Sequence, residues 1–390
     1  MKEIETEVLI VGSGLVGLVA AHCLSALNYK VTIVDKSNFL DSKKVFNDTR
    51  TVAVSEGSKR FLNTLSLWKD LEPHAESIKN INVYDRLSTN KILFNNQIKN
   101  EKLGYVIENK KFSKILIKKL KKFKKTNVLY DFDIDNVELE EMRSRAFSKN
   151  NTIRAKLIIA ADGKNSKIRK ITGNKIFKKH YTESALVLNF VHEKNLNNTA
   201  FEIFYNSGPL AILPMKSRKG FFQSTVIWSN KDVFLKKLVS RETDFVKSYM
   251  EEKVFDIVGQ INKINSSQIF PLSAHINDFF YNKGLIYIGD SAHSIHPIAG
   301  QGWNLGLNDV KHLYNLCKNN KTNIGSDLFC KTYNQQSYQK AFQLFQVTDK
   351  LNSHFKKNGR LYRHFSNIGF DFIENTRPLK NKIAKYAMGI

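Results

Sequence analysis

The sequence predicts an α/β protein (α+β overall), in which a Rossmann-like nucleotide-binding domain is interrupted by an antiparallel-sheet domain and followed by a helical region. A glycine-rich turn follows an apolar strand at 12–17, alternating strands cover 180–228, and the chain beyond Asp327 has helical spacing. With 390 residues, the chain is long enough for two domains and a sizeable core.

The N-terminal segment has the βαβ pattern of a dinucleotide-binding unit. An apolar strand at 8–11 leads through a helix to a second strand at 30–34. At the first turn, Gly12 permits a tight bend, Gly14 lets the backbone approach a pyrophosphate, and Gly17 lets helix and strand pack closely. The combination of strand, glycines, helix and strand predicts nucleotide binding.

Charged side chains follow these two strands. Asp35 ends the second strand, where it is placed to bind a ribose 2′-hydroxyl, and an acid here favours FAD or NAD over NADP. Arg50 lies near the expected path of a long cofactor, although on local grounds it is equally a surface arginine. Ser55 is expected to cap a helix over 56–65.

A second strand end with an acid and a glycine lies at 157–163. The buried strand 157–160 leads to Asp162 and Gly163, and the glycine allows a turn close to a ligand. Alone, this pair is an ordinary Asp-Gly turn. Together with the other glycine-rich turns, it predicts a third side of one nucleotide-binding site.

The stretch 284–309 predicts a site for an anion and a polyol. A buried strand at 285–288 ends in Gly289 and Asp290, and a helix begins at about Trp303. The loop between them contains Pro297, Gly300 and Gly302. Free backbone N–H groups and the helix dipole converge at such a helix start, and the aspartate can accept hydrogen bonds from hydroxyl groups.

The remaining chain divides into strands and helices around these turns. We expect short strands within 78–107, a helix over 111–123, strands at 127–131, 142–148, 153–160 and 268–275, and helices at 232–239 and 243–254. The expected domains are a discontinuous nucleotide-binding domain (1–77, 103–172 and 280–326), an antiparallel-sheet substrate domain (78–102 and 173–279) and a C-terminal helical region (327–390).

The formal charge of +25 fits an anionic membrane surface, but the abundance of Lys, Asn and Ile is also typical of AT-rich coding. The lysine-rich end of the helix at 111–123 is a solvated face or a phospholipid-facing patch, and no motif indicates nucleic acid. Three scattered cysteines suit a reducing, cytoplasmic location. His293 and His296 lack supporting carboxylates and precede Pro297, so no metal is expected.

The three turns, GSGLVG at 12–17, ADGKNSKIR at 161–169 and IGDSAHSIHPIAGQGWNLGLND at 288–309, resemble those of class A flavoprotein monooxygenases, the p-hydroxybenzoate-hydroxylase-like group. Further stretches resemble the ubiquinone-biosynthesis hydroxylases of the UbiH/UbiF/VisC type. They are DTRTVAVSEGSKRFL, GYVIEN, AFEIF, GPLAILP, VIWS and VTDKL. The resemblance spans nearly the whole chain.

The resemblance implies roles for residues already singled out. Gly12, Gly14, Gly17 and Asp35 would hold the ADP half of FAD, Arg50 would lie near the flavin end, and Asp290 would bind the ribitol. Asp162 and Gly163 would serve both FAD and the nicotinamide. The segment from Gly289 to Asn304 would hold the ribitol and the reduced ring of FAD. Within it, the loop from Pro297 through Gly300 to Gly302 would lie against the flavin ring, and the helix start from Gly302 to Asn304 would stabilise negative charge on it. Asn109 replaces the arginine of many relatives, and Trp303 replaces a smaller apolar residue.

The resemblance also implies a reaction. NAD(P)H would reduce FAD, O₂ would add to the flavin, and the C4a-hydroperoxyflavin would hydroxylate a polyprenylated phenol. The alternatives are a related flavoenzyme acting on another aromatic or alkene substrate, and a non-catalytic FAD-binding subunit of a quinone-synthesis assembly. No catalytic base is identified. His293, His296 and Tyr205 have side chains of a type that can act as a base, but none of them is nominated. The basic, Phe-rich C-terminal helices would cap the domains or rest peripherally on anionic lipid, and other ubiquinone-synthesis enzymes are candidate partners.

Overall fold

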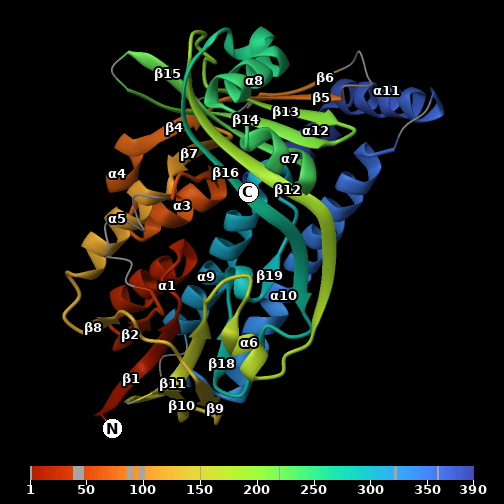
Figure 1. Cartoon of the computed structure of the whole chain (residues 1–390). Coiled ribbons are helices and arrows are strands. Elements are labelled where there is room, and N and C mark those ends of the chain that lie inside the picture. Colours follow the sequence, from red (N-terminus) through yellow and green to blue (C-terminus); the bar gives the residue numbers. More distant parts are fainter. Residues whose placement is uncertain are drawn as a thin grey trace.

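The computed structural model of the protein describes residues 2–37, 48–85, 91–95, 102–149, 151–218, 220–319, 323–357 and 360–390. Its described strands form two large sheets and one small sheet, with helices between and around them (Figure 1). The mixed α/β architecture predicted from the sequence is confirmed.

The first large sheet, here called the parallel sheet, has the strand order β17-β18-β11-β1-β2-β8, with β10 and β9 added beside β11. Strands β18, β11, β1, β2 and β8 pair in parallel. The strands are β1 (Lys2–Val11), β2 (Val31–Val34), β8 (Thr126–Leu129), β9 (Asn136–Glu138), β10 (Ser144–Ser148), β11 (Asn151–Ala160), β17 (Tyr281–Asn282) and β18 (Leu285–Tyr287).

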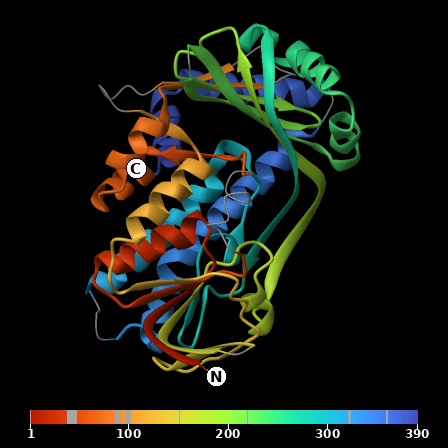
Figure 2. The ribbon, with the colours of Figure 1, turned by 60° about the vertical axis from the view of Figure 1, so that its left-hand side comes forward.

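The second large sheet, here called the long-strand sheet, has the order β19-β16-β12-β15-β14-β13-β5-β6. Its strands are β5 (Asn80–Asp85), β6 (Lys91–Asn95), β12 (Ile176–His192), β13 (Thr199–Tyr205), β14 (Gly208–Arg218), β15 (Phe221–Lys231), β16 (Ile261–Asn277) and β19 (His293–Ser294). Strands β12 and β16 extend along one side of the molecule from the parallel sheet into the second half (Figure 2). The pairing of β13 with β5 is parallel, so the expected antiparallel sheet is mixed at this position.

The small sheet contains β3 (Thr51–Ser55), β7 (Gly104–Glu108) and β4 (Ala75–Ile78), and it lies between the two large sheets. The helices are α1 (Leu15–Ala26), α3 (Glu56–Thr64), α4 (Trp68–Leu71), α5 (Asn109–Leu120), α6 (Lys167–Ile171), α7 (Asp232–Val239), α8 (Thr243–Val258), α9 (Gln301–Asn319), α10 (Asp327–Phe355), α11 (Arg360–Asn375) and α12 (Arg377–Met388). Short 3₁₀ turns occur at Glu72–His74, Gly289–Ser291 and Ile298–Gly300.

Two large apolar cores and one smaller cluster hold the described layers together. One large core contains the buried strands of the parallel sheet with α1, α5 and α9, and the other lies between the long-strand sheet and helices α7 and α8. The strand expected at 268–275 is longer, because β16 pairs with β12 from Ile261 to Asn277 through several register shifts. Polar residues along its first half hide the alternation that a strand normally shows.

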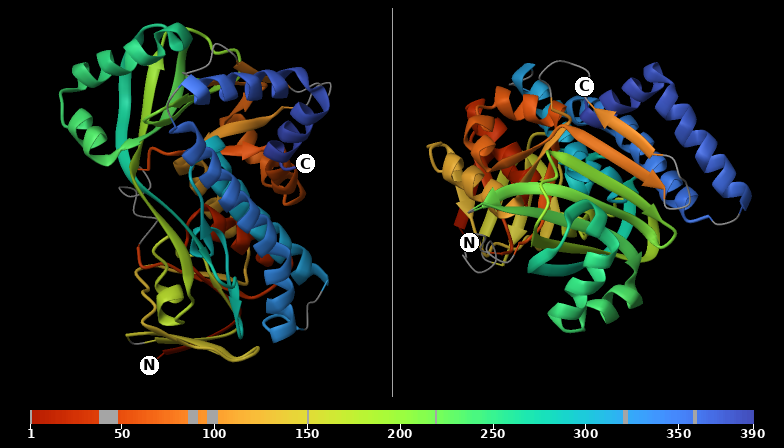
Figure 3. Two further views of the ribbon diagram at one scale, coloured as in Figure 1. Left: turned by 90° about the vertical axis from the view of Figure 1, so that its right-hand side faces the viewer. Right: turned by 90° about the horizontal axis from the view of Figure 1, so that it is seen from above.

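The C-terminal helices pack back onto both halves of the molecule. Helix α10 runs beside α9, and α11 lies beside β6 (Figure 3). Helix α12 ends against α3, because a Cβ at Gly57 would lie 2.3 Å from the carbonyl oxygen of Gly389. None of the described helices is long and apolar enough to cross a membrane. The domain boundaries expected from the sequence stay a prediction.

Candidate functional site

The parallel sheet brings the predicted turns to one edge. Val11 pairs with both Val34 and Ala160, and Ala160 pairs with Tyr287. The carboxyl ends of β1, β2, β11 and β18 are therefore neighbours, and the turns that follow them lie at the same edge of the sheet. Ligands of open α/β sheets bind outside such strand ends.

The first turn is built closely around glycine. Gly12 has φ +109°, and a Cβ there would lie 2.3 Å from the carbonyl oxygen of Ala161. A Cβ at Gly17 would lie 2.2 Å from the carbonyl oxygen of Gly12. By contrast, a Cβ at Gly14 would meet nothing within 4 Å. Gly12 and Gly17 are thus required by the protein itself, whereas Gly14 borders open space.

Helix α1 begins at this open space without a side-chain cap and without an acid in its first turn. Its free N–H groups and positive dipole end favour a bound anion such as a phosphate. Asp35 lies beside the turn, where one carboxylate oxygen accepts hydrogen bonds from Ser13 N at 2.8 Å and Ser13 Oγ at 2.5 Å. The other oxygen accepts from Ser37 N at 2.9 Å. The oxygen that accepts from Ser37 N has a second lone pair for a hydroxyl donor.

Asp162 caps the short helix α6. Its Oδ2 accepts hydrogen bonds from Lys167 N at 2.7 Å and Ile168 N at 3.1 Å. Its Oδ1 is buried without a hydrogen-bond partner among the described residues. The adjacent Gly163 has φ +80°, and a Cβ there would meet nothing within 4 Å. An acceptor without a partner beside an open glycine indicates a place for a ligand donor.

The Gly289–Asp290 turn is fixed by a buried ion pair. Asp309 on α9 accepts hydrogen bonds from Gly289 N at 2.9 Å and His293 Nε2 at 2.7 Å. Burial by itself lowers the pKa of His293, but attraction to Asp309 outweighs it and leaves the pKa raised. Gly289, with φ +58°, packs against Val16 of α1.

Asp290 projects from this turn and is accessible to solvent, although protein atoms surround it closely. Burial raises the pKa of its carboxyl, while His293, Lys164 and Arg50 oppose that rise. This carboxylate is therefore accessible to a ligand donor although protein atoms lie close to it. Arg50 is held by Asp48 through two hydrogen bonds of 2.9 Å and lies 5.4 Å from the ring centroid of Phe270.

The last turn leads into α9. Gly300 has φ +60°, and the first turn of α9 contains Gly302 and no acidic residue. The Asn304 amide is already used within the protein. Its oxygen accepts from Ser55 N at 2.9 Å and Ser58 Oγ at 2.8 Å, and its nitrogen donates to Ala53 O at 2.9 Å. Any contact of Asn304 with a cofactor is therefore expected from its backbone.

The two positions that depart from the family pattern have clear packing partners. Trp303 lies against Phe112 of α5, with 5.3 Å between ring centroids. Asn109 donates a hydrogen bond to Asp48 at 3.3 Å, so it supports the carboxylate that holds Arg50. Among the described residues, no cluster of His, Cys, Asp and Glu could hold a metal ion.

Arg169 was not singled out from the sequence, yet it joins three parts of the site. Its guanidinium is buried and donates to Ser291 O at 3.1 Å and Lys164 O at 2.7 Å, and it lies 2.9 Å from His275 Nε2. The arginine forms part of the ADGKNSKIR stretch, but only the fold shows which carbonyl groups it reaches. Asp309 was missed for the same reason.

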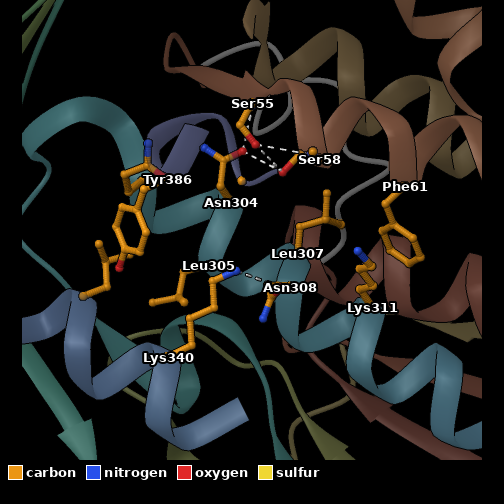
Figure 4. A pocket seen from close by; sticks show the side chains of 14 residues that line it. Ser55, Ser58, Phe61, Asn304, Leu305, Leu307, Asn308, Lys311, Lys340 and Tyr386 are labelled. Atoms are coloured by element: carbon orange, nitrogen blue, oxygen red, sulfur yellow. Dashed lines mark hydrogen bonds between the residues drawn. The ribbon is translucent and has the colours of Figure 1, made fainter. Parts of the chain in front are cut away.

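A separate hollow lies behind the start of α9 (Figure 4). Its lining includes Ser55, Ser58, Asn304, Lys311 and Tyr386. Of the residues predicted to bind a cofactor, only Asn304 reaches it, and no glycine turn at a strand end opens into it. The other predicted cofactor residues lie at the strand ends, at a predicted site here called the cofactor groove, and not around this hollow.

The fold and the strand-end turns define a dinucleotide-binding protein. The FAD binding domain family matches residues 5–348, and the chain belongs to that family. Its cofactor is FAD, and the residues fit that group. Gly14 and Gly163 leave room beside the turns, Asp162 has an unused buried acceptor, and Asp290 is accessible to solvent. Which residue holds which part of FAD stays a prediction.

Relatives extend the comparison over the whole chain. Ubiquinone hydroxylase UbiL of Rhodospirillum rubrum is 26% identical and covers 98% of this chain and 89% of its own. The 3-demethoxyubiquinol 3-hydroxylase of Escherichia coli is 24% identical and covers 99% of both chains. Human ubiquinone biosynthesis monooxygenase COQ6 is 25% identical, covering 98% of this chain and 92% of its own.

Solved structures share the fold. The p-nitrophenol 4-monooxygenase PnpA of Pseudomonas putida DLL-E4 superposes with a TM-score of 0.79 at 16% identity and covers 100% of this chain and 99% of its own. PqsL of P. aeruginosa in complex with 2-aminobenzoylacetate gives a TM-score of 0.76 at 15% identity, covering 93% and 100%.

Proposed function

We propose that this protein is a FAD-dependent monooxygenase that hydroxylates the aromatic ring of a polyprenylated phenol in ubiquinone biosynthesis. NAD(P)H is the reductant and O₂ the co-substrate. The observation that carries the proposal is that named ubiquinone hydroxylases and a ubiquinone biosynthesis monooxygenase align with 98–99% of the chain. The alignment includes both the cofactor groove and the long-strand sheet.

Bound FAD supplies the electron transfer and the activation of O₂, and the protein supplies position, charge and exclusion of water. In this proposal the turn of Gly12, Gly14 and Gly17 receives the pyrophosphate, and Asp35 accepts a hydrogen bond from the ribose. Asp290 accepts hydrogen bonds from the ribitol. The absence of an acid in the first turn of α9 supports a role for its N–H groups in stabilising negative charge on the bound ring.

The reductant binds transiently in this proposal. The sequence has one GxGxxG turn, at 12–17, and that turn is assigned to FAD. Asp162 and Gly163 lie at the same edge of the sheet and combine an unused acceptor with open space, which supports them as part of the nicotinamide site.

Peripheral contact with an anionic membrane is the finer part of the proposal. A prenylated phenol partitions into lipid, so an enzyme at the bilayer surface meets it directly. Exposed Phe372 and Tyr386 on α11 and α12 accompany exposed Arg377, Lys382 and Lys385. Aromatic side chains interspersed with cations are typical of surfaces that rest on anionic lipid.

The biochemical test uses the purified yellow protein. NADH or NADPH consumption is measured with and without a short-chain prenylated phenol, and the product is examined by mass spectrometry. We expect phenol-dependent consumption and a product heavier by one oxygen atom. A flavin-free protein would contradict the FAD assignment, and bound flavin without turnover would favour a non-catalytic subunit.

The cellular test identifies the substrate. Deletion of the gene in the source cell, followed by mass spectrometry of quinone intermediates, should show accumulation of one prenylated phenol. The missing oxygen on that intermediate names the ring carbon. Normal quinone content without any accumulated precursor would remove the ubiquinone assignment while leaving the flavoenzyme assignment intact.

A further inference from the structure

The long-strand sheet has one face toward α7 and α8 and another toward the cofactor-binding half. Strand alternation assigns residues to these faces. On β13, Phe201 and Ile203 belong to the core under α7 and α8, while Ala200 packs on the other side with Met215 and Met388. Glu202 therefore lies with Ala200 and Phe204 on the face toward the cofactor-binding half, here called the inner face.

The register extends this inner face across the sheet. Glu202 pairs with Val83 of β5 on one side and Ala211 of β14 on the other, and Ala211 pairs with Ile227 of β15. These four residues, here called the inner row (Val83, Glu202, Ala211 and Ile227), are each partly accessible. Glu202 is the single charged residue among three apolar neighbours.

A series of contacts links the strand that carries Glu202 to the elements around the start of α9. On one side, Phe204 stacks on Phe355 at the end of α10, with ring centroids 3.7 Å apart. The next residue, Lys356, forms an ion pair with Glu183 of β12, whose other oxygen lies 3.9 Å from His296 Nε2. His296 directly precedes the loop that leads to α9.

Further contacts connect the start of α9 with β13. The Gln301 side chain donates to Ala387 O at 3.2 Å, and the neighbouring Met388 packs with Ala200 and Met215. The two neighbours of Glu202 on this face of β13 thus contact the end of α10, through Phe204, and the end of α12, through Ala200, and α12 is bonded to the start of α9. In the proposed function, this part of the sheet faces the ring end of the cofactor groove.

Glu202 differs from the other carboxylates near this face in having no partner. Glu183 is paired with Lys356, and Asp85 accepts a hydrogen bond from Ser366. Glu202 makes no hydrogen bond or ion pair with the described residues. Burial among apolar groups raises its pKa to about 8, and no charged neighbour contributes to that shift. A base with a pKa near the working pH is suited to proton transfer with a phenol.

We infer that Glu202 is the general base that accepts the hydroxyl proton of the phenolic substrate, and that the inner row is the surface on which the aromatic ring lies. The inference rests on the proposed function. Glu202 was not identified from the sequence, because only the strand register shows that it lies on the inner face while its neighbour Ile203 is buried under α7 and α8.

Protons and electrons balance over one turnover. The phenol O–H bond breaks, its electron pair stays on oxygen, and the proton passes to the Glu202 carboxylate. The phenolate oxygen raises electron density on the ring. Bound FAD, reduced by NAD(P)H, would supply O₂ at the peroxide level; the ring C–O bond would form as the O–O bond breaks, and the electron pair of that bond would leave on the second oxygen, which takes up protons and departs as water. The hydroxylated carbon then loses its own proton to water, the ring becomes aromatic again, and Glu202 returns its proton to the product oxygen.

The first test compares Glu202→Gln with Glu252→Gln, a control on the exposed side of α8. In the wild type, kcat/KM for a short-chain prenylated phenol should rise with pH through about 8. Glu202→Gln should lose that step and lower kcat by roughly 10²–10⁴-fold with normal flavin content. Glu202→Asp should keep the step with reduced kcat, and the control should match the wild type. A wild-type pH profile in Glu202→Gln would overturn the inference.

The second test needs no turnover. The affinity of the oxidised holoprotein for 4-nitrophenol, which ionises readily, is measured by equilibrium dialysis without NAD(P)H. At about pH 9, Glu202→Gln should bind the phenolate roughly tenfold more tightly than the wild type, because a like charge has been removed. At about pH 6, where Glu202 is protonated, the two affinities should agree. Equal affinities at both pH values would contradict the placement of Glu202 beside the ring.

The two arms separate the inference from the proposed function. If the wild type hydroxylates no phenol, the proposed function fails, while the dialysis result still reports whether Glu202 faces a bound phenol. If the wild type hydroxylates the phenol and Glu202→Gln is unchanged in both arms, the function stands and the role of Glu202 is wrong.

Discussion

At the scale of single residues, two glycines of the first turn have different surroundings. Gly12 combines a positive φ with a backbone contact from Ala161, so any side chain would force the two strand ends apart. Gly14 has φ −61° and open space in front of it, so a methyl group there harms nothing in the protein itself. The two positions therefore separate folding from cofactor binding.

We predict that Gly14→Ala weakens FAD binding at least tenfold while leaving the unfolding free energy of the flavin-free protein within about 0.5 kcal/mol of wild type. Gly12→Ala should cost about 3 kcal/mol of stability or more, from backbone strain plus the clash. Isothermal titration with FAD and urea unfolding measure the two quantities. Unchanged FAD affinity in Gly14→Ala would show that the pyrophosphate lies elsewhere.

The surroundings of Asp290 disfavour its charged form, which lowers the stability of the folded protein. Its carboxyl is crowded by protein, which raises its pKa, and no hydrogen bond to it is found among the described residues. We predict that Asp290→Ala lowers FAD affinity and leaves thermal stability of the flavin-free protein equal or higher. Flavin retention after dialysis and the melting temperature check this expectation. Normal flavin retention would rule out the ribitol assignment.

At the scale of elements, the His293–Asp309 pair ties the turn after β18 to α9. Because the pKa of His293 is raised, its stabilising contribution is fully present below about pH 6.5 and is lost as pH rises through the folded value. We predict that His293→Gln costs about 3 kcal/mol at about pH 6 and less at about pH 9. Urea unfolding at the two pH values measures the difference.

His275 provides a control of opposite sign. Burial, followed by the nearby Arg169, lowers the pKa of His275 to about 3, so the folded protein keeps it neutral. Its neutral form costs stability as pH falls below about 6.5, where the unfolded chain takes up a proton. The cost of His275→Gln should therefore be smaller at about pH 6 than at about pH 9. Two variants with the same pH trend would contradict this assignment.

At the scale of the whole molecule, the long strands β12 and β16 and the segment after Asp48 join the two halves. Thr49 accepts a hydrogen bond from Asn189 at its carbonyl oxygen, at 2.6 Å, and its hydroxyl donates to Gln268 at 2.9 Å. Both partners lie on the inner face of the long-strand sheet. The residue before Arg50 is therefore held by hydrogen bonds to the long-strand sheet.

The charge of +25 is also a property of the whole molecule. We predict that the protein binds vesicles containing anionic lipid, that binding falls with added salt, and that neutral vesicles bind little. Replacing the exposed cations of the C-terminal helices by glutamate (Arg377, Lys382 and Lys385) should reduce sedimentation with anionic vesicles several-fold. Tight binding by this variant would indicate that these charges are compositional.

A matched triple variant locates the surface. Lys121, Lys122 and Lys125 follow helix α5 and are exposed, but they have no exposed large apolar neighbour of the kind found on α11 and α12. Changing these three lysines to glutamate should leave vesicle binding nearly unchanged. The reverse result, with loss in this variant alone, would place the membrane contact at the end of α5.

The strand-end turns could be located from the sequence because local signals specify a strand followed by a glycine turn, while their roles toward FAD stay a prediction. The apolar strand before Gly12, the spacing to Asp35 and the Gly289–Asp290 pair each carry their meaning within a few residues. The parallel sheet then needs only the usual strand order to bring them together. Asn304 shows where this reasoning stops, because its amide reaches Ser55 and Ser58, about 250 positions earlier in the chain.

The sequence by itself determined the nucleotide-binding unit, the family resemblance and the positions of most strands and helices, because periodicity and glycine turns are local signals. Tertiary structure alone decided the buried links made by Arg169 and Asp309, and the isolation of Glu202 on the inner face. Those properties depend on which distant groups surround a side chain. Burial and partner choice set the chemistry of a charged residue, and neither is written in its immediate sequence.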